Sequence, residues 1–472
     1  VRRLTEAMGF FAARAQYAGQ SYLDIMRRTL LQEFFPYLLS PVPALGMLRA
    51  VPTAKMSEVT VLPFGTVLAA TNPAVDRTAV VRTLDELTIM PIEMYRLDQI
   101  QQGEDGVRLQ MRFKGAYKRN DEIGDLKVYV DQLGDFISSI RVLNAIKHGL
   151  VRAAVVFTED ESSLIRPEDG QSLHVEFPES QASHSQEFRH PIERERWFFQ
   201  QPERALFFNL CLTDVPRNWR TFTVILDIND WPTQVRLTQD SLKLFVVPVA
   251  NIVRDFAEPV LYEGTVETIT VRHPSTSQRY APHSVVGVYR IEDGEMLPLQ
   301  NGVVSSASGS YQALDDGRRS SELNSRISIK LPEAFDSSVV LSVDAFWHQP
   351  WLSELSRERL DYRLYRSSEA GIRWDALGDL VPFGRPASWG GDDEYLRLFT
   401  LQNKSVLNHD DIQALLAALG AVGQRAFSSV TSAWRGTLCE QMPNQRSSAG
   451  LKTVFTFQFN RLSDDLQPVA DA

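Results

Sequence analysis

Cysteine is scarce in this sequence, with only Cys211 and Cys439 among its 472 residues. Two thiols in so long a chain do not form a disulfide framework, and they favour a reducing compartment. The chain is longer than the roughly 250–300 residues at which a single hydrophobic core stops growing, so we expect several packed units. A protein of this size buries enough apolar surface to be stable without disulfides.

Long apolar runs and an excess of basic residues are also missing. No window approaches the about 18 apolar residues of a membrane-spanning helix, so no membrane insertion is predicted. The N-terminal stretch VRRLTEAMGFFAARAQ is interrupted by Glu6 and Arg14, which is not the pattern of a secretory signal peptide. The net charge is −10, with 59 acidic and 49 basic residues, which argues against nucleic acid as the main partner.

The sequence also lacks motifs for catalysis or cofactor binding. No glycine-rich loop precedes Lys and Ser or Thr, so no phosphate-binding P-loop is predicted. His174, His184 and His190 fit no zinc spacing, and Cys439 would need a histidine nearby to act as a nucleophile. We therefore predict no catalytic residue, no metal site and no cofactor. The distant alternative is a β-rich hydrolase with two carboxylates about 5–10 Å apart in a groove lined by Trp.

What the sequence does have is a very apolar N-terminal region. Apolar residues recur every three or four positions through residues 1–39, which predicts helix, and Leu30–Leu48 reads LLQEFFPYLLSPVPALGML. A proline disfavours helical geometry in the residue before it, so Pro41 ends the helix and an extended segment follows. Just before this end, apolar side chains nearly encircle the predicted helix, whereas a helix of a lone domain needs only one apolar stripe.

We therefore predict that partner helices cover this segment in an inter-subunit bundle; the alternative is a helix buried in its own chain's core. A second apolar segment, RWFFQQPERALFFNL, combines aromatic and Arg residues, which are enriched at protein interfaces. It too has the alternative interpretation of a core segment. The predicted interface residues of the two segments are Phe11, Leu30, Leu31, Phe34, Phe35, Tyr37, Leu38, Leu39, Trp197, Phe198, Phe199 and Arg204.

Predicted strands dominate the remainder of the chain. RLQMRF and LKVYV alternate apolar with other residues, and TFTVILDI places Phe222, Val224, Leu226 and Ile228 on one face. LKLFVVPVANIV is nearly all apolar, so we expect a strand that is buried on both faces. Residues 302–326 are rich in Ser and Gly, which predicts a loop.

Two helices are predicted among these strands. DQLGDFISSIRVLNAIKHGLVRAAVVF indicates a helix that leads into a strand, and NHDDIQALLAALG indicates a helix with Asn408 as N-cap, Asp411 at N3 and Gly420 at C′. We predict a multidomain, mixed α+β protein. Its expected parts are an N-terminal helical segment (1–50), an α/β domain (51–160), a β-rich middle domain that starts with a polar excursion (161–290) and a C-terminal α+β domain (291–472).

Several motifs occur in the order that is found in one known family. RRLTEAMGFFAARAQ and FFPYLLSPVPALGML resemble the TssF (ImpG, VasA) segments VERLxEAFAFLxAR and LLYPHYLRPIPSM. Later segments of the TssF family are similar to FFQQPERALFFNL, LFVVPVANIVRDFAEPV and YLRLFTLQNKSVLNHDDIQALL. The sequence departs from the family at one stretch, where Trp347, His348 and Gln349 replace the family's Cys-Thr-Asn-Arg-Asp. LPFGTVL and VVRTLDELTIMPIEM resemble IPRGTxL and FRTxxDVxLxPL, with matches at Gly65, Thr66, Arg82, Thr83, Asp85 and Pro91.

By these motifs the sequence is identified as a divergent member of the TssF family, baseplate subunits of the bacterial type VI secretion system. The resemblance implies a fold like that of contractile-phage baseplate wedge proteins, with no enzymatic activity. It implies assembly with TssG, a second copy of TssF, TssK, TssE and the spike protein VgrG, in the cytoplasm at the inner-membrane complex. The alternative is a wedge protein of a contractile phage tail or of an extracellular injection particle.

Overall fold

The computed structural model contains two compact units, each built from separate stretches of the chain. The large unit consists of Val42–Val253, Gln349–Gly384 and Lys404–Ala472, and the small unit of Val1–Pro41, Arg254–His348 and Arg385–Asn403. The division into four consecutive domains stays a prediction. The residues that the structure describes are 8–17, 19, 26, 41–72, 75–103, 105–119, 123–158, 170–178, 191–213, 215–216, 219–266, 268–302, 309–315, 325–331, 338–355, 359–365, 371–384, 397, 400–401, 404, 406–421, 425–443 and 451–460.

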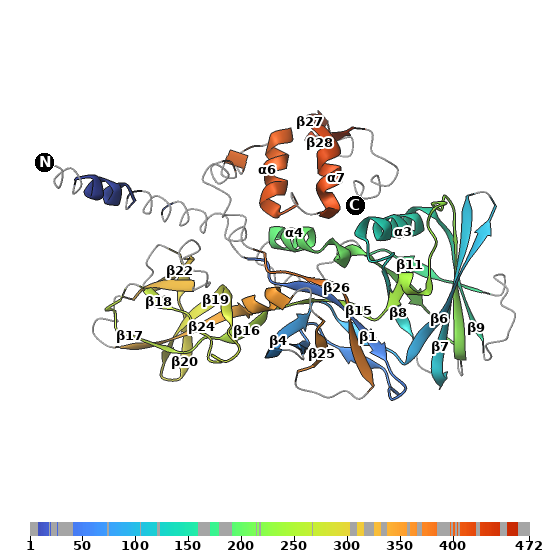
Figure 1. Ribbon diagram of the computed structural model, residues 1–472, viewed down its shortest axis with the longest axis horizontal. Coiled ribbons are helices and arrows are strands. Elements are labelled where there is room, and N and C mark those ends of the chain that lie inside the picture. Colours follow the sequence, from blue (N-terminus) through green and yellow to red (C-terminus); the bar gives the residue numbers. More distant parts are fainter. Residues whose placement is uncertain are drawn as a thin grey trace. The chain divides into compact units, whose positions relative to one another are not determined.

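A closed β-barrel forms one part of the large unit, in the strand order β1, β15, β4, β3, β25, β26 (Figure 1). The strand β1 confirms the extended segment that was predicted after Pro41, and it pairs with both β15 and β26. Two short strands, β2 (Thr60–Leu62) and β5 (Leu87–Ile89), pair separately. The barrel strands are β1 (Leu45–Pro52), β3 (Val67–Asn72), β4 (Val75–Thr83), β15 (Val246–Ala250), β25 (Asp361–Leu364) and β26 (Ile372–Val381).

Two further sheets of the large unit have the orders β10-β9-β13-β7-β6 and β11-β12-β8-β14. Helix α3 (Phe136–Gly149) leads directly into β9, as predicted. β7 and β8 likewise confirm the strands predicted from RLQMRF and LKVYV. The strands are β6 (Ile92–Gln102), β7 (Gly106–Arg119), β8 (Gly124–Val130), β9 (Leu150–Thr158), β10 (Gln171–Ser172), β11 (His174–Glu176), β12 (Phe207–Leu212), β13 (Trp219–Ile228) and β14 (Leu242–Leu244).

Strand β13 confirms the predicted apolar face, and its opposite face is buried as well. The predicted apolar face lies in the hydrophobic core, yet Thr223 and Ile225 on the opposite face are also buried. The neighbouring strand β7 supplies the reason, since its register places Arg112 opposite Thr223 and Gln110 opposite Ile225. Long polar side chains at these positions shield the shorter ones. The alternation of apolar residues therefore identified the strand and its core face, but it did not show that the second face is buried too.

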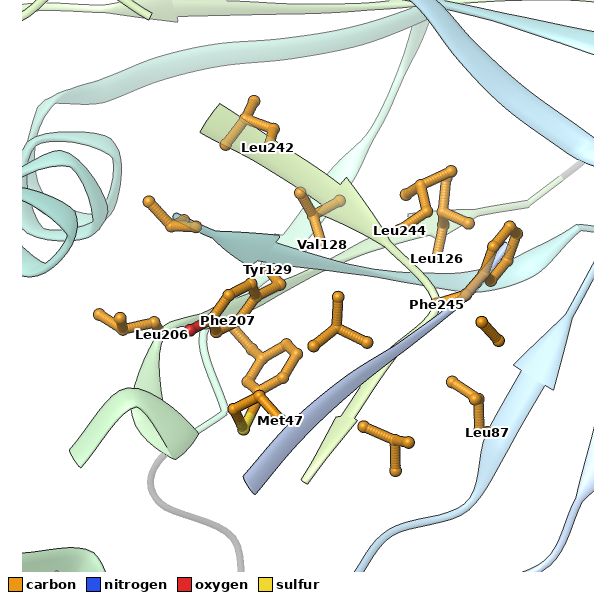
Figure 2. Close-up of a cluster of buried hydrophobic side chains, with 14 of the residues drawn as sticks. Met47, Leu87, Leu126, Val128, Tyr129, Leu206, Phe207, Leu242, Leu244 and Phe245 are labelled. Atoms are coloured by element: carbon orange, nitrogen blue, oxygen red, sulfur yellow. The ribbon is translucent and has the colours of Figure 1, made fainter. Parts of the chain in front are cut away.

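The apolar segment LKLFVVPVANIV is buried as predicted along β15, but it is not one continuous strand. The chain changes direction at Phe245, whose φ angle is 58°. β14 pairs with β8 before this point, and β15 joins the barrel after it. Left-handed geometry is unfavourable for a bulky residue. Burial of the phenyl ring offsets this strain, and Figure 2 shows Phe245 in a cluster with Leu126, Leu244 and Leu87.

Helices and a β-ribbon complete the large unit. Helix α6 confirms its predicted ends: Asn408 Oδ1 accepts from Asp411 N over 2.9 Å, and Gly420 has a φ of 87°. These elements are α4 (Pro191–Gln200), α6 (His409–Leu419), α7 (Arg425–Ala433), the 3₁₀ turns η2 (Pro202–Ala205), η3 (Gln239–Ser241) and η5 (Pro350–Leu355), and the ribbon strands β27 (Trp434–Pro443) and β28 (Leu451–Phe459).

The small unit contains a sandwich of two sheets (Figure 1). Alternate residues of β24, from Leu341 to Trp347, are buried in the core that the two sheets share. The prediction of a loop over residues 302–326 is wrong for Ser310–Asp315, which pairs with β23 as strand β22. Ser and Gly lower strand propensity, but a partner strand outweighs this local preference. The strands are β16 (Val253–Phe256), β17 (Val260–Tyr262), β19 (Ala281–Glu292), β20 (Glu295–Pro298) and β24 (Val339–His348) in one sheet, and β18 (Thr268–Thr270), β21 (Gln300–Asn301), β22 and β23 (Ser325–Lys330) in the other.

Candidate protein interfaces

The N-terminal helix exposes large apolar side chains along its described part. Residues 8–17 are helical, as predicted, and Phe11 keeps 68% of its surface exposed. Met8 and Phe11, three positions apart, lie on one side of the helix. Phe10 and Tyr17, which are seven positions or about two turns apart, lie on another side. All four side chains are exposed. Apolar exposure on more than one side of a helix is the pattern expected when neighbouring helices cover it.

The second half of the apolar N-terminal region lies outside the described residues. This applies to Leu30, Leu31, Phe34, Phe35, Tyr37, Leu38 and Leu39, so the helical bundle stays a prediction. The described chain resumes at Pro41, whose carbonyl oxygen accepts from His283 Nε2 over 2.6 Å. This bond ties the end of the N-terminal region to strand β19 within the small unit.

The predicted aromatic segment, residues 196–210, takes part in packing within the large unit. Trp197 is buried, and Phe198 and Phe199 are half-buried. The rings of both phenylalanines lie against Phe427 of α7, with centroid separations of 6.1 and 5.3 Å. Phe136 of α3 contacts the same ring at 6.1 Å. These side chains therefore join α3, α4 and α7, and their role in binding a partner stays a prediction.

Arg204, the fourth predicted interface residue of this segment, lies over the Trp197 ring at 5.9 Å. Burial lowers the pKa of its guanidinium to about 10, and the negative charge of Asp85 opposes this shift. Asp85 also forms an ion pair with Lys127 of β8. The cation is thus held by an aromatic face and a nearby carboxylate, an arrangement that stabilises charge in a partly desolvated place.

Other residues that matched the family motifs have structural roles at a turn. Gly65 has a φ of 80°, which a residue with a Cβ rarely adopts. The next residue donates from Thr66 N to Thr83 Oγ1 over 3.0 Å, and Thr66 Oγ1 donates to the carbonyl of Pro63 over 2.6 Å. The pattern Gly-Thr followed by Arg-Thr therefore locks the turn before β3 to the end of β4.

The residues considered for chemistry do not form a reaction centre in the described part of the chain. His174 is exposed on β11, and both cysteines are only half-buried. Burial and the Asp125 carboxylate raise the pKa of the Cys211 thiol to about 12, which keeps it unreactive. Among the described residues, no group of three or more His, Cys, Asp or Glu side chains could hold a metal ion. No described helix is long and apolar enough to cross a membrane.

Sequence reasoning missed an apolar row on the small unit. The register aligns Leu261 of β17, Val340 of β24, Ile291 of β19 and Met296 of β20 across adjacent strands. Residues directly opposite one another share a face of the sheet, and this face is the one turned away from the sandwich core. In the sequence, β17, β20 and β24 carry consecutive apolar residues here, and nothing indicated which face they would occupy or that the strands would align.

The ribbon of β27 and β28 is a second apolar surface that the sequence did not reveal. Leu438, Met442, Phe455 and Phe457 are all exposed. The register pairs Leu438 with Thr456 and Phe455 with Cys439, so the leucine and the phenylalanine lie on opposite faces of the ribbon. A two-stranded ribbon is marginally stable alone in water. In the sequence its signal is the alternate Phe residues of FTFQF in β28.

These features define a β-rich protein with several apolar surfaces suited to protein–protein contact. The chain belongs to the TssF family: the family described as "Type VI secretion system, TssF" matches residues 1–343. This confirms the family that the motifs predicted. No curated protein matches the chain.

Two solved structures resemble the chain in fold. One, described as the type VI secretion system TssK-TssF-TssG baseplate subcomplex, has a TM-score of 0.76 at 14% identity and covers 96% of this chain and 88% of that chain. The other, described as the baseplate complex from the type VI secretion system, has a TM-score of 0.58 at 12% identity and covers 100% and 86%. At these identities the likeness establishes the fold.

Proposed function

We propose that this chain is a structural subunit of a type VI secretion baseplate, and that it works by binding TssG and TssK. Membership of the TssF family over residues 1–343 carries this proposal. The similarity in fold to a chain of a TssK-TssF-TssG subcomplex supports it, because the likeness extends over 96% of this chain. The exposed apolar side chains of the N-terminal helix supply a physical reason, since an isolated chain leaves them in water.

The finer parts of the proposal concern the other neighbours and the cellular place. We infer contacts with a second copy of the chain, with TssE and with the spike protein VgrG, in a cytoplasmic baseplate docked at the inner-membrane complex. We also infer that the N-terminal helix enters an inter-subunit bundle. Covering about 1,000 Å² of apolar surface is worth about 25 kcal/mol before the entropic cost of association is subtracted. The chain acts as a scaffold and not as an enzyme.

Co-expression of the full chain with TssG and TssK from the same gene cluster tests the proposal. We expect one complex that contains all three proteins and more than one copy of this chain, measured by native mass spectrometry. Phe11→Asp should release the partners, because it places a charge in a desolvated interface. Val151→Asp is the matched control, since Val151 is also highly exposed but lies on β9 of the large unit. A chain that stays monomeric and binds neither TssG nor TssK would refute the proposal.

A further inference from the structure

The outer face of the β17-β24-β19-β20 sheet has the composition of an interface core. In a sandwich, the faces that look away from the core normally carry polar side chains. Here Leu261 is 58% exposed, Met296 43% and Val340 36%, and Ile291 lies between them. The opposite face of β24, from Leu341 to Trp347, is fully buried in the small unit's own core. The exposed row is therefore not needed to hold the two sheets together.

Aromatic side chains extend this apolar surface beyond the row. Tyr289 lies two residues from Ile291 on the same face of β19, and its ring meets Phe256 of β16 edge to face at 6.5 Å. Tyr289 also folds over Gly287, where an added Cβ would lie 2.9 Å from the phenol oxygen. The glycine thus lets the ring lie flat along the sheet. Phe256 itself is exposed.

The centre of the outer face carries no net charge. Arg254 and Asp344 form its ion pair at 2.6 Å, with the Asp344 side chain only 4% exposed and the Arg254 side chain 57% exposed. The guanidinium makes further bonds to both carboxylate oxygens, so the two charges compensate each other. Depletion of unpaired charge together with enrichment of aromatic and Met side chains is typical of the buried centre of protein interfaces.

The border of the row is acidic. Glu292, Asp293 and Glu295 form the turn between β19 and β20, and Glu263 follows directly after β17. All four are exposed, and Arg290, the cation of β19 beside this turn, is paired with Glu292 at 3.3 Å. Asp293 and Gly294 have φ angles of 49° and 86°, the geometry of a tight hairpin turn. Glu292 and Glu295 pair with each other next to Ile291 and Met296, so strand alternation turns them to the other face. Glu263, two residues after Leu261 on the same face, and Asp293, in the turn, are the acidic groups that border the row.

We propose that this outer face binds a different protein, which presents an apolar strip flanked by Lys and Arg side chains. Charge decides between this partner and a second copy of the chain. Two copies placed face to face would bring their acidic borders into one interface, and each copy has a net charge of −10. A basic border on the partner neutralises Glu263 and Asp293 while the apolar strip covers the row. The proposal rests on the proposed function for its source of partners, the other baseplate subunits.

Site-specific photocrosslinking in the native bacterium tests the proposal. The probe is p-benzoylphenylalanine in place of Val340 in the full chain, and the control carries the same probe in place of Val151, which is 65% exposed. We expect the Val340 position to crosslink to another protein. Peptide mapping should place the crosslink in an apolar segment that has Lys or Arg within a few residues. A crosslink to a second copy, to the chain itself or to a segment without basic residues overturns the proposal, and so does a yield equal to the control.

A change of charge at the acidic border tests its contribution to binding independently of the apolar row. Glu263→Lys combined with Asp293→Asn should lower the Val340 crosslink roughly tenfold, because rim charges set the rate and salt dependence of association. The matched control, Glu58→Lys combined with Glu86→Gln, makes the same change in net charge on exposed residues of the large unit. Equal yields in the two double variants would overturn the acidic border's role. If the unmodified chain does not co-purify with TssG and TssK but the Val340 crosslink is retained, the proposed function is contradicted and the docking face is not.

Discussion

Asn251 and Gln349 hold each other by reciprocal hydrogen bonds, although 98 residues separate them in the chain. The backbone N–H of Gln349 donates to Asn251 Oδ1 over 2.7 Å, and Asn251 Nδ2 donates to Gln349 Oε1 over 3.2 Å. Both side chains also bind the backbone of Val80: its N–H donates to Gln349 Oε1 over 2.7 Å, and its carbonyl accepts from Asn251 Nδ2 over 2.7 Å.

This arrangement completes the barrel where strand β15 ends. Strand β15 pairs with β4 at Val249 and Ala250. Beyond these residues, the side chains of Gln349 and Asn251 form hydrogen bonds with the N–H and the carbonyl of Val80. A buried backbone group left without a partner costs about 1–3 kcal/mol. Asn251 lies in the segment LFVVPVANIVRDFAEPV, which resembles the family, and its place in the barrel is a structural reason for an Asn at that position.

Replacing Asn251 by Leu should destabilise the large unit by about 3 kcal/mol, because the Val80 carbonyl and the Gln349 N–H both lose their partner. Urea unfolding of the full chain measures this change through the midpoint of the transition. Asn301→Leu is the control: Asn301 is exposed on β21, so a change within about 0.5 kcal/mol is expected. Equal midpoints for the two variants would show that the side-chain bonds contribute nothing.

Phe427→Ala should loosen the packing between α4 and α7, because one ring contacts Phe198, Phe199 and Phe136. We expect a loss of about 2 kcal/mol, at the low end for a phenylalanine because the ring is only half-buried. Hydrogen exchange should accelerate in Pro191–Gln200 and Arg425–Ala433. Phe457→Ala, on the exposed ribbon, should leave these two segments unchanged. Unaltered exchange in the first variant would contradict the aromatic cluster's role.

Cys211 should resist alkylation in the folded protein. Its pKa is raised to about 12 by burial and by Asp125, so the reactive thiolate is roughly a ten-thousandth of the population at pH 8. In a Cys439→Ser background, iodoacetamide labelling followed by mass spectrometry should show Cys211 unmodified until denaturant is added. Adding Asp125→Asn should speed the reaction, because the carboxylate that disfavours the thiolate is gone. Labelling as fast as in the unfolded chain would contradict this prediction.

The small unit should lose stability when the pH falls from 7 to 5. Burial holds the pKa of His348 well below its usual value, reinforced by the nearby His283, and burial also lowers the pKa of His273 against the opposing charge of Asp255. The unfolded chain therefore binds more protons than the folded one below about pH 6.5, so stability rises with pH in this window. It is lost as the pH falls towards the folded-state pKa values.

Hydrogen exchange of β23 and β24, corrected for the intrinsic effect of pH, measures this dependence. His348→Gln should flatten it, because the amide does not titrate. An exchange-derived stability that stays constant between pH 7 and pH 5 would contradict the assigned direction. The barrel strand β1 of the large unit serves as an internal reference, since the histidines invoked here all lie in the small unit.

Local structure was determined by the sequence where neighbouring residues supply the whole signal. The helix α6 begins after Asn408 and ends before Gly420 because a side-chain oxygen can satisfy the first free N–H groups and a glycine can adopt a positive φ. Helix α3 and the strands β7 and β8 follow their apolar periods for the same reason. The family was likewise visible in the order of short motifs.

Tertiary contacts decided the rest. The sequence alone shows neither the turn at Phe245 nor the strand β22, since each depends on a partner strand that lies elsewhere in the chain. Trp197 is apolar in any setting, and only packing determined that its own chain buries it. The row from Leu261 to Met296 exists because strand register aligns four separate strands. A period of two identifies the faces of a strand, but which face is covered is settled by residues far away in sequence.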